Sequence, residues 1–276
     1  MEDRDGFRKR YGNILSLMKV KVDSMALRVV SHFYDPMYHC FTFPDYQLSP
    51  TLEEFAYIVR IPIRDKIIFI GGEKKPKSRI IGASLHVPKV EVENGLITKG
   101  GIFGFPIKYL GERASHYANM GSNYVFEEIL ALMIYGILLF PRFKDFVYMD
   151  VIRVFMTCNL VPTLLGDVYY PIHFRTKKKG GWVRCCAPIL YKWFISHLLQ
   201  STLYNKDNLM WSKRLMALTN KDIVWYNAAY DIGTITVSCG EFHNTPFVSM
   251  KGVITYNPSL AYRHLGYSMD DKPKSL

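Results

Sequence analysis

The sequence predicts a mainly α-helical protein: a single globular helical domain around a buried central helix, with a few short β-strands. Three observations support this fold class. The segment Tyr124–Phe140 is more continuously apolar than any other segment of helical length. Elsewhere, apolar residues recur at spacings of three and four, which is the period of an amphipathic helix. Hydrophobic residues make up 49% of the 276 positions and aromatic residues 14%, which is ample for a substantial core.

The central segment has the features of a helix that is buried on all sides. Glu127 and Glu128 are its only charges, Gly136 is its only strong breaker, and Pro141 follows where a helix commonly stops. Apolar side chains therefore fall on nearly every face. The charge-free part, Ile129–Phe140, is shorter than the roughly 18 residues that a bilayer span needs. We therefore expect a core helix and no membrane segment.

The other elements follow from periodicity, caps and breakers. Thr51 and Glu54 have the spacing of a capping box, and Asp23 can cap the helix that starts at Ser24. We expect Glu53 and Glu54 to lie in the first turn, where carboxylates suit the helix dipole. The expected helices span 7–18, 24–34, 51–59, 106–119, 124–140, 144–157, 161–169, 182–203, 206–218 and 259–267, with strands at 39–43, at 66–70 and beyond 219.

These elements divide the chain into a domain with short tails. We expect a charged tail at 1–10, the helical domain at 11–269 and a second tail at 270–276. Within the domain, residues 61–104 mix Gly, Pro and Lys with brief aliphatic runs, which indicates a loop-rich insert with one helical turn near 88–92. The polar stretch 171–182 contains three consecutive lysines and two glycines and is expected to be an exposed turn.

Charge and cysteine content limit the class of protein. The formal charge of +11 arises from 35 Lys and Arg against 24 Asp and Glu, and favours an anionic partner. The five cysteines are odd in number and scattered, and no hydrophobic leader begins the chain, so we expect a reduced, intracellular compartment. We expect the cysteines to pack as small apolar groups.

The sequence contains no recognisable catalytic, cofactor or metal motif. The glycines near Lys99 lack Walker and Rossmann spacing, and no GxSxG, HExxH or SxxK signature is present. Cys239 and His243 lack the second ligand pair of a zinc site, and the vicinal Cys185 and Cys186 fit a buried helix. We therefore predict no catalytic residues, no cofactor and no metal.

Two basic clusters are the most credible functional feature. If both lie on one face, with Trp182 and His173 exposed, they could bind phosphates and stack on bases. The alternative is a solvated surface without a partner. The candidate nucleic-acid-binding residues are Arg175, Lys177, Lys178, Lys179 and Trp182, together with Lys74, Lys75, Lys77 and Arg79.

Several blocks, in order, resemble the plant mobile domain family, and in particular its legume-rich branch of uncharacterised proteins. The blocks are CFTFPDYQLSPTLEEFAYIVRIPI, YGILLFP, GGWVRCCAPILYKWFISHL, VWYNAAYD and CGEFHNTPFVSMKGVITYNPSLAYRHLGY, and the resemblance spans about 7–269. The family is sometimes described as aminotransferase-like, but no lysine here has a recognisable pyridoxal-phosphate context. The chain begins inside the first block and lacks the polar tail of longer members, as a gene fragment would.

The resemblance implies a mostly helical domain that occurs in plant host proteins and in transposable elements, and that is linked in host members to transposon silencing and genome maintenance in the nucleus. We accordingly expect a non-enzymatic module that contacts a protein or nucleic acid and is nuclear rather than cytoplasmic. Two alternatives remain: a basic nucleic-acid-binding module of a transposable element, and a cryptic enzyme with a polar cavity. The sequence indicates neither a specific partner nor an oligomeric state.

Overall fold

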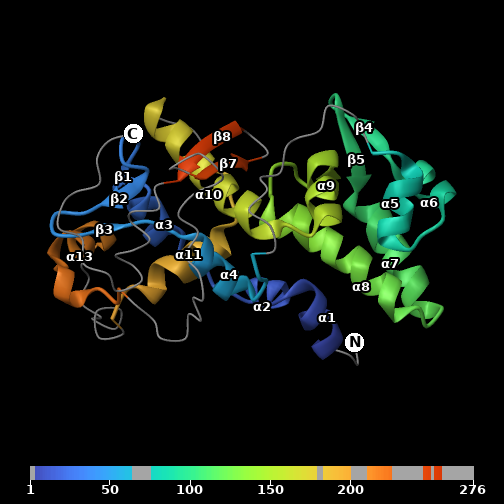
Figure 1. The fold of residues 1–276 in the computed structure, drawn as a ribbon, viewed down its shortest axis with the longest axis horizontal. Helices are drawn as coiled ribbons and strands as arrows, with labels where there is room; N and C mark the ends of the chain where they lie inside the picture. Colours follow the sequence, from blue (N-terminus) through green and yellow to red (C-terminus); the bar gives the residue numbers. More distant parts are fainter. Residues whose placement is uncertain are drawn as a thin grey trace.

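The helices of this protein form two lobes that share one hydrophobic core (Figure 1). The computed structural model describes residues 4–63, 76–178, 183–199, 210–225, 245–249 and 252–256. The helices are α1 (Arg4–Tyr11), α2 (Ile14–Leu17), α3 (Ser24–Val30), α4 (Leu52–Val59), α5 (Ser78–Leu85), α6 (Lys89–Gly95), α7 (Ile107–Asn119), α8 (Asn123–Ile134), α9 (Met149–Thr157), α10 (Leu160–Lys177), α11 (Ala187–Ser196) and α13 (Trp211–Ala217), with a π-helical turn η1 (Tyr135–Leu139) and a 3-10 turn η2 (Asn220–Asp222).

The strands form small antiparallel sheets at the edges of the helices. They are β1 (Tyr34–Asp35), β2 (Cys40–Thr42), β3 (Gln47–Leu48), β4 (Ile97–Lys99), β5 (Ile102–Pro106), β6 (Phe146–Tyr148), β7 (Thr245–Ser249) and β8 (Gly252–Tyr256). The sheet orders are β1-β2-β3, β4-β5-β6 and β7-β8. The mainly α fold class is therefore confirmed.

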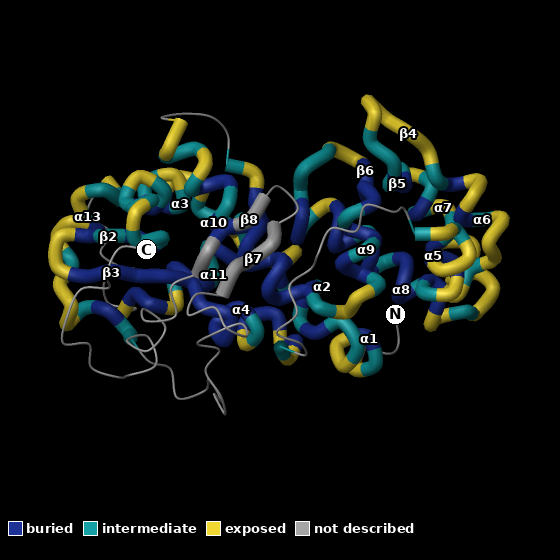
Figure 2. The backbone as a smooth tube through the Cα atoms, turned by 45° about the horizontal axis from the view of Figure 1, so that its top comes forward, coloured by how far each residue is buried: buried dark blue, intermediate teal, exposed yellow. Residues whose placement is uncertain are grey.

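Each lobe contains one long, largely buried helix. The first lobe comprises α3, α10, α11, α13 and β1–β3, and the second comprises α5–α9 and β4–β6 (Figure 1). Buried positions predominate in α4, α8, α9 and the first part of α10, whereas exposed positions gather at the outer ends of the two lobes (Figure 2). None of the helices in the described ranges is both long and apolar enough to cross a bilayer.

The central apolar segment is buried, as predicted, but it is not one regular helix. After Ile134 the α-helix α8 continues as the π-helical turn η1, and Phe140 N donates to the Tyr135 carbonyl at 2.9 Å. A Cβ on Gly136 would lie 2.6 Å from Val147 Cγ2. Glycine at position 136 therefore allows β6 to approach the helix closely, a packing role that the sequence did not reveal.

The signals at helix starts were accurate. The predicted capping box is present, since Glu54 N donates to Thr51 Oγ1 at 3.1 Å and Thr51 N donates to Glu54 Oε2 at 2.9 Å. Asp23 accepts from the amides of Met25 and Ala26, and so caps α3. The helix expected at 106–119, the strand at 39–43 and the position of Pro188 in the first turn of α11 are also confirmed.

Two predicted helices near the N-terminus were too long. The helix at 7–18 divides at Gly12, which has φ +64° and whose Cβ would lie 2.2 Å from the Val59 carbonyl oxygen. The helix at 24–34 ends at Val30, because Tyr34 pairs with Phe41 as a strand. In both cases a contact with a distant segment overrides a continuous helical period.

Further predictions were wrong about the type or the length of an element. The described part of the 61–104 insert is not loop-rich: it contains α5, α6, β4 and β5, whereas the expected strand at 66–70 lies outside the described residues. The helix expected at 144–157 begins as strand β6. Helices predicted at 182–203 and 206–218 are shorter, as α11 and α13, and the final helix after Asn257 lies outside the described residues.

The expected exposed turn at 171–182 begins instead as the last turns of α10. This helix continues through Pro171 to Lys177, although proline removes one helical hydrogen bond. Pro171 and Ile172 are buried. Burial of this apolar face offsets the lost hydrogen bond, so the helix extends into the basic segment.

Candidate functional site

The described basic residues among those singled out from the sequence lie in two different lobes. Arg175, Lys177 and Lys178 lie at the C-terminal end of α10 in the first lobe, whereas Lys77 and Arg79 lie at the start of α5 in the second lobe (Figures 1 and 2). The other four candidates lie outside the described residues, and are Lys74, Lys75, Lys179 and Trp182. The structure therefore leaves two separate basic positions.

An exposed aromatic ring accompanies the basic end of α10. Phe174 is 45% exposed, and Lys178 Nζ lies 4.4 Å from the centroid of its ring. Tyr170 stacks against Phe174 with centroids 6.0 Å apart and an interplanar angle of 13°. Because 170, 174, 177 and 178 are three or four residues apart, these side chains share one face of the helix. We call Phe174, Arg175, Lys177 and Lys178 the α10 surface.

A groove of about 540 Å³ adjoins the α10 surface, between α3, α10 and the start of α11. Leu27, Ile172 and Leu190 supply apolar lining, and Arg28 and Arg175 supply positive charge. Arg175 Nη1 donates to Ser31 Oγ at 2.7 Å, which fixes the guanidinium beside the groove. This part of the surface therefore combines an anion-attracting edge with an apolar floor.

His173 is half-buried beneath the α10 surface and does not form part of it. Its Nδ1 lies 3.4 Å from the Tyr34 hydroxyl, and its ring meets the His39 ring edge-on at 4.9 Å. Burial, followed by the positive charges of His39 and Lys177, lowers the pKa of His173 to about 4. At neutral pH His173 is therefore uncharged, and it adds nothing to the basic character of the site.

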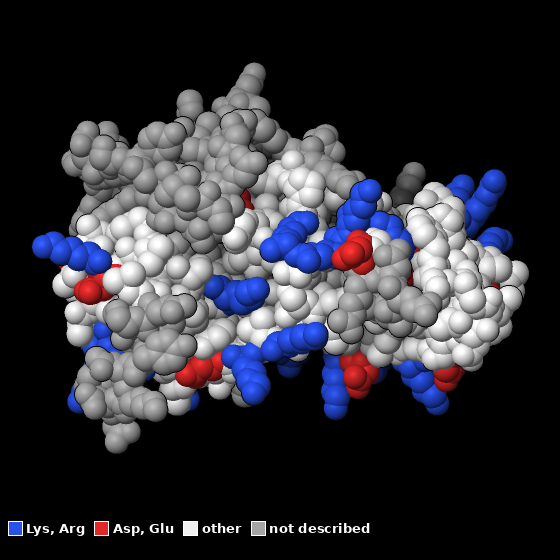
Figure 3. All heavy atoms as spheres, turned by 90° about the horizontal axis from the view of Figure 1, so that it is seen from below, with Lys and Arg blue, Asp and Glu red and all other residues white. Residues whose placement is uncertain are grey.

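A third basic region was not singled out from the sequence. Lys and Arg gather across the middle of the face seen from below, where α1, α2 and α4 lie (Figures 1 and 3). Arg8 and Lys9 of α1 and Arg60 after α4 are exposed. The FRKR run at 7–10 carries part of this charge, and it belongs to the segment expected to be a charged tail.

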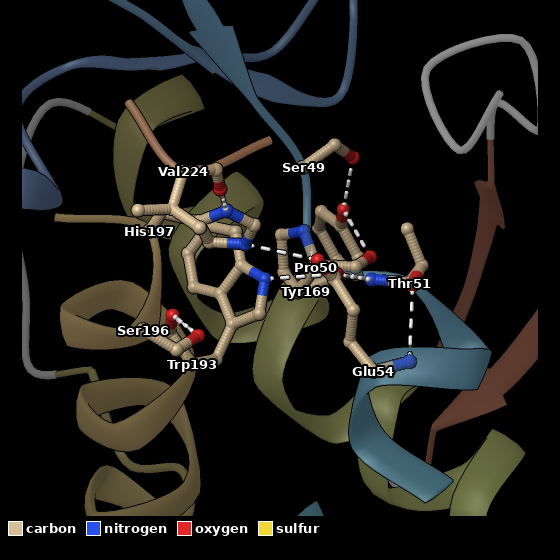
Figure 4. Close-up of polar contacts among 9 residues, drawn as sticks. All are labelled: Ser49, Pro50, Thr51, Glu54, Tyr169, Trp193, Ser196, His197 and Val224. Atoms are coloured by element: carbon tan, nitrogen blue, oxygen red, sulfur yellow. Dashed lines mark hydrogen bonds and ion pairs between the residues drawn. The ribbon is translucent and has the colours of Figure 1, made fainter. Parts of the chain in front are cut away.

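The first lobe also contains a buried polar network, which joins α4, α10 and α11 (Figure 4). Glu54 Oε2 accepts from Trp193 Nε1 at 2.9 Å, and Glu54 Oε1 lies 2.9 Å from His197 Nε2. His197 Nδ1 lies 2.9 Å from the Val224 carbonyl oxygen. The Tyr169 hydroxyl contacts Ser49 Oγ at 2.5 Å.

This network holds the fold together and is closed to substrates. Glu54 and Trp193 are 0% exposed and His197 is 1% exposed. The first-turn position predicted for Glu54 is confirmed, but its partners from α11 could not be read from the sequence. Ser196, next to His197 in the sequence, has a different partner, since its Oγ donates to the Trp193 carbonyl at 2.6 Å.

The two acidic residues of the central segment are buried and paired. Arg10 Nη2 contacts Glu127 Oε2, and His86 Nδ1 lies 2.7 Å from Glu128 Oε2. Burial raises the pKa of Glu128, and its contact with His86 partly opposes this rise. Glu127 and Glu128 therefore anchor α1 and α5 to α8 through their charged side chains.

The cysteines follow the expected apolar role with one exception. Cys40, Cys185 and Cys186 are buried, and burial raises the pKa of the Cys40 thiol to about 11. Cys158 is exposed and takes a left-handed conformation at the end of α9, and Cys239 lies outside the described residues. Cys185 and Cys186 precede α11 and are not within it. Within the described ranges, no group of three His, Cys, Asp or Glu side chains could hold a metal ion.

These features define a mainly helical globular domain with a basic and aromatic helix end and a separate buried acidic pair. The chain belongs to the family DUF7745, a domain of unknown function, whose family model matches residues 1–276. No curated protein and no solved structure matches the sequence.

Proposed function

We propose that this domain is a non-enzymatic interaction module that binds single-stranded nucleic acid at the α10 surface. The observation that carries the proposal is the exposed Phe174 ring, which Lys178 lies over, at a helix end that also carries the cations Arg175 and Lys177. Proteins that bind single strands combine a basic track for the phosphates with rings on which bases stack. The excess of positive charge over the whole chain supports the same class of partner.

The groove beside α10 supplies a continuation of this surface. Arg28 and Arg175 line the groove at one end of the row formed by Lys177 and Lys178. A strand whose bases stack on Phe174 would bring its phosphates toward these cations, where release of counterions favours binding. The resemblance to the plant mobile domain family supports a nuclear role near transposon-derived sequences, such as silencing or genome maintenance.

The test is binding of a labelled oligonucleotide of mixed sequence, as DNA and as RNA, measured by fluorescence anisotropy at several salt concentrations. Lys177→Glu with Lys178→Glu should weaken binding strongly. A matched control is Lys99→Glu with Lys108→Glu, which changes the same charge at two exposed positions of the second lobe. Equal losses in both double variants would indicate a net-charge effect only, and absence of binding at low salt would remove the proposal.

A protein partner is the competing outcome. If the α10 variants lose capture of an acidic peptide but bind oligonucleotides as the wild type does, the surface serves protein recognition instead. The enzyme alternative would concern a different part of the protein from the α10 surface. Titratable residues line a cavity in the second lobe.

A further inference from the structure

A cavity of about 230 Å³ lies in the second lobe, against the buried acidic pair. Residues from five elements line it, and they are spread between positions 10 and 158 of the sequence. The lining residues that matter here are Arg10, Tyr11, Ser84, Glu128, Tyr135 and Phe155. We call this cavity the Glu128 pocket.

One wall of the pocket is aromatic. The rings of Tyr11 and Phe155 stack on each other, with an interplanar angle of 17° and centroids 5.9 Å apart. Tyr135, in the π-helical turn, stands at 83° to Phe155 with centroids 5.3 Å apart. Because Arg10 also lies over Tyr11, a ligand ring would meet the edges of these side chains, and edge-on contacts between aromatic rings are favourable.

The polar part of the pocket offers both a hydrogen-bond donor and a hydrogen-bond acceptor. Arg10 Nη1 is buried and has no hydrogen-bond partner in the described part of the chain, although Nη2 is held by Glu127. Buried donors are almost always paired, so Nη1 calls for an acceptor. The Glu128 carboxylate can accept about four hydrogen bonds, and His86 uses only part of that capacity.

The charges already present decide what kind of ligand fits. A cation is disfavoured because the Arg10 guanidinium lies 5.4 Å from the Tyr11 ring centroid and 4.2 Å from that of Tyr124, where it already occupies the ring faces. An anion is disfavoured because the buried Glu128 carboxylate lines the same space. The remaining class is a neutral ring with an acceptor next to N–H donors.

We propose that the Glu128 pocket binds a planar lactam of nucleobase type, and that guanine is the best match. Its O6 would accept from Arg10 Nη1, its N1–H and N2–H would donate to Glu128, and its ring would pack edge-on against Tyr11, Tyr135 and Phe155. Hydrogen bonds to the pairing edge are the usual way proteins recognise an extruded base. The volume is below the roughly 300–1,000 Å³ of sites for drug-sized ligands, which suits a single base.

Two kinds of ligand could present the hydrogen-bonding edge of guanine: a free guanine nucleoside, or a guanine within a nucleic-acid strand. The exposed cations Arg8 and Lys9 lie on α1, the helix that contributes Arg10 and Tyr11, and could contact flanking phosphates. The inference stands apart from the α10 surface, because the pocket lies in the other lobe. Loss of binding at α10 would leave it unchanged.

The experiment titrates guanosine, adenosine, cytidine and uridine against the full chain and detects binding by saturation-transfer NMR. Guanosine should bind at least about tenfold more tightly than the other nucleosides, because only guanine offers two donors beside an acceptor. Glu128→Gln should weaken guanosine binding by about tenfold or more, since the amide cannot accept both donors. Choline and inorganic phosphate serve as probes for the two excluded charge classes.

A second pair of variants distinguishes loss of binding from loss of folding. Ser84→Phe fills the pocket from α5 and leaves every residue of the charged pairs unmutated, and Ala83→Phe places the same ring at the exposed neighbouring position. Guanosine binding should be lost in the first and kept in the second. Any one of four results would overturn the proposal. They are equal guanosine binding by the two variants, preference for another nucleoside, preference for choline or phosphate, and no nucleoside or strand binding up to about 1 mM.

A strand arm separates the sources. In the background of Lys177→Glu with Lys178→Glu, an oligoadenylate containing one guanine is compared with the same strand lacking it. A preference for the guanine strand that Ser84→Phe abolishes supports recognition within a strand. A preference for free guanosine alone supports a nucleoside ligand.

Discussion

Trp193 Nε1 donates a hydrogen bond of 2.9 Å to Glu54 Oε2, which joins α11 to the first turn of α4 inside the core. The same carboxylate oxygen accepts from Thr51 N, and the other oxygen faces His197 Nε2 at 2.9 Å. One side chain therefore caps a helix and joins segments that are more than a hundred residues apart in sequence.

Replacement of Glu54 by Ala should destabilise the protein strongly. The change leaves the buried donor of Trp193 unpaired and removes the partner of His197, and the loss of one member of such a buried cluster costs about 3–5 kcal/mol. Urea unfolding followed by Trp fluorescence measures this loss. A cost below about 1 kcal/mol would show that the network is dispensable.

Two capping boxes in the described ranges allow a comparison. Thr51→Ala removes a buried cap, and Thr219→Ala removes a hydroxyl that contacts Asp222 Oδ2 at 2.8 Å on the surface. We expect the first to cost about 1–2 kcal/mol and the second less than about 1 kcal/mol, because water replaces a lost partner only at the surface. Equal costs would mean that burial does not strengthen the Thr51 cap.

Gly136→Ala should destabilise the second lobe. The new Cβ would lie 2.6 Å from Val147 Cγ2, and such overpacking typically costs about 1–3 kcal/mol. Gly111→Ala is the control, since its Cβ would meet only Met133 Cε at 3.9 Å, and alanine should stabilise α7 by up to about 1 kcal/mol. Adding Val147→Ala to Gly136→Ala should recover part of the lost stability if the clash is the cause.

The protein should become less stable as the pH is lowered, because His173 titrates. Its pKa is about 4 in the folded protein and has an ordinary value of 6.5, so between these values the unfolded state binds more protons. The contribution is therefore complete above 6.5 and is lost as the pH falls toward 4. The neighbouring groups that oppose the charged form are His39 and Lys177, and Tyr34 is the hydrogen-bond partner.

The measurement is the melting temperature of the wild type minus that of His173→Gln, at about pH 7.5 and at about pH 5. The difference should become smaller or negative at the lower pH, because glutamine carries no charge to bury. A difference that does not change with pH would remove His173 from the acid response.

The salt dependence of oligonucleotide binding should report the number of phosphate contacts at the α10 surface. For a single strand, each neutralised phosphate contributes about 0.7 to the slope of log K against log salt concentration. Lys177→Glu with Lys178→Glu should therefore reduce the slope by about one to two units. Phe174→Ala should weaken binding with little change in the slope, since stacking, worth about 1–3 kcal/mol per base, is insensitive to salt.

The sequence was most informative where local rules operate alone. The capping box at Thr51 and Glu54, the Asp23 cap and the α7 helix depend on neighbouring residues, and all three were predicted correctly. The burial of Tyr124–Phe140 also followed from its composition, but its π-helical turn did not. Assignment to the plant mobile domain family remains a prediction, beside the membership in DUF7745.

The sites were less accessible to prediction. Arg175, Lys177 and Lys178 were expected on an exposed turn, but they lie at the end of α10. Lys178 lies over the Phe174 ring, and the described residues of the second basic cluster lie at α5 in the other lobe. The Glu128 pocket was missed because its residues come from α1, α5, α8, η1 and α9. No spacing in the sequence connects them.

By itself the sequence determined the helical class, the positive charge and the local starts of several helices, because hydrophobic period and end-capping act over a few residues. Only the tertiary structure decided that α10 extends past Pro171, that Glu54 meets Trp193, and that Arg10, Tyr11 and Glu128 share a cavity. These relationships depend on which distant surfaces become buried together. That choice is made by the packing of the whole core, where the free energy of burial outweighs local preference.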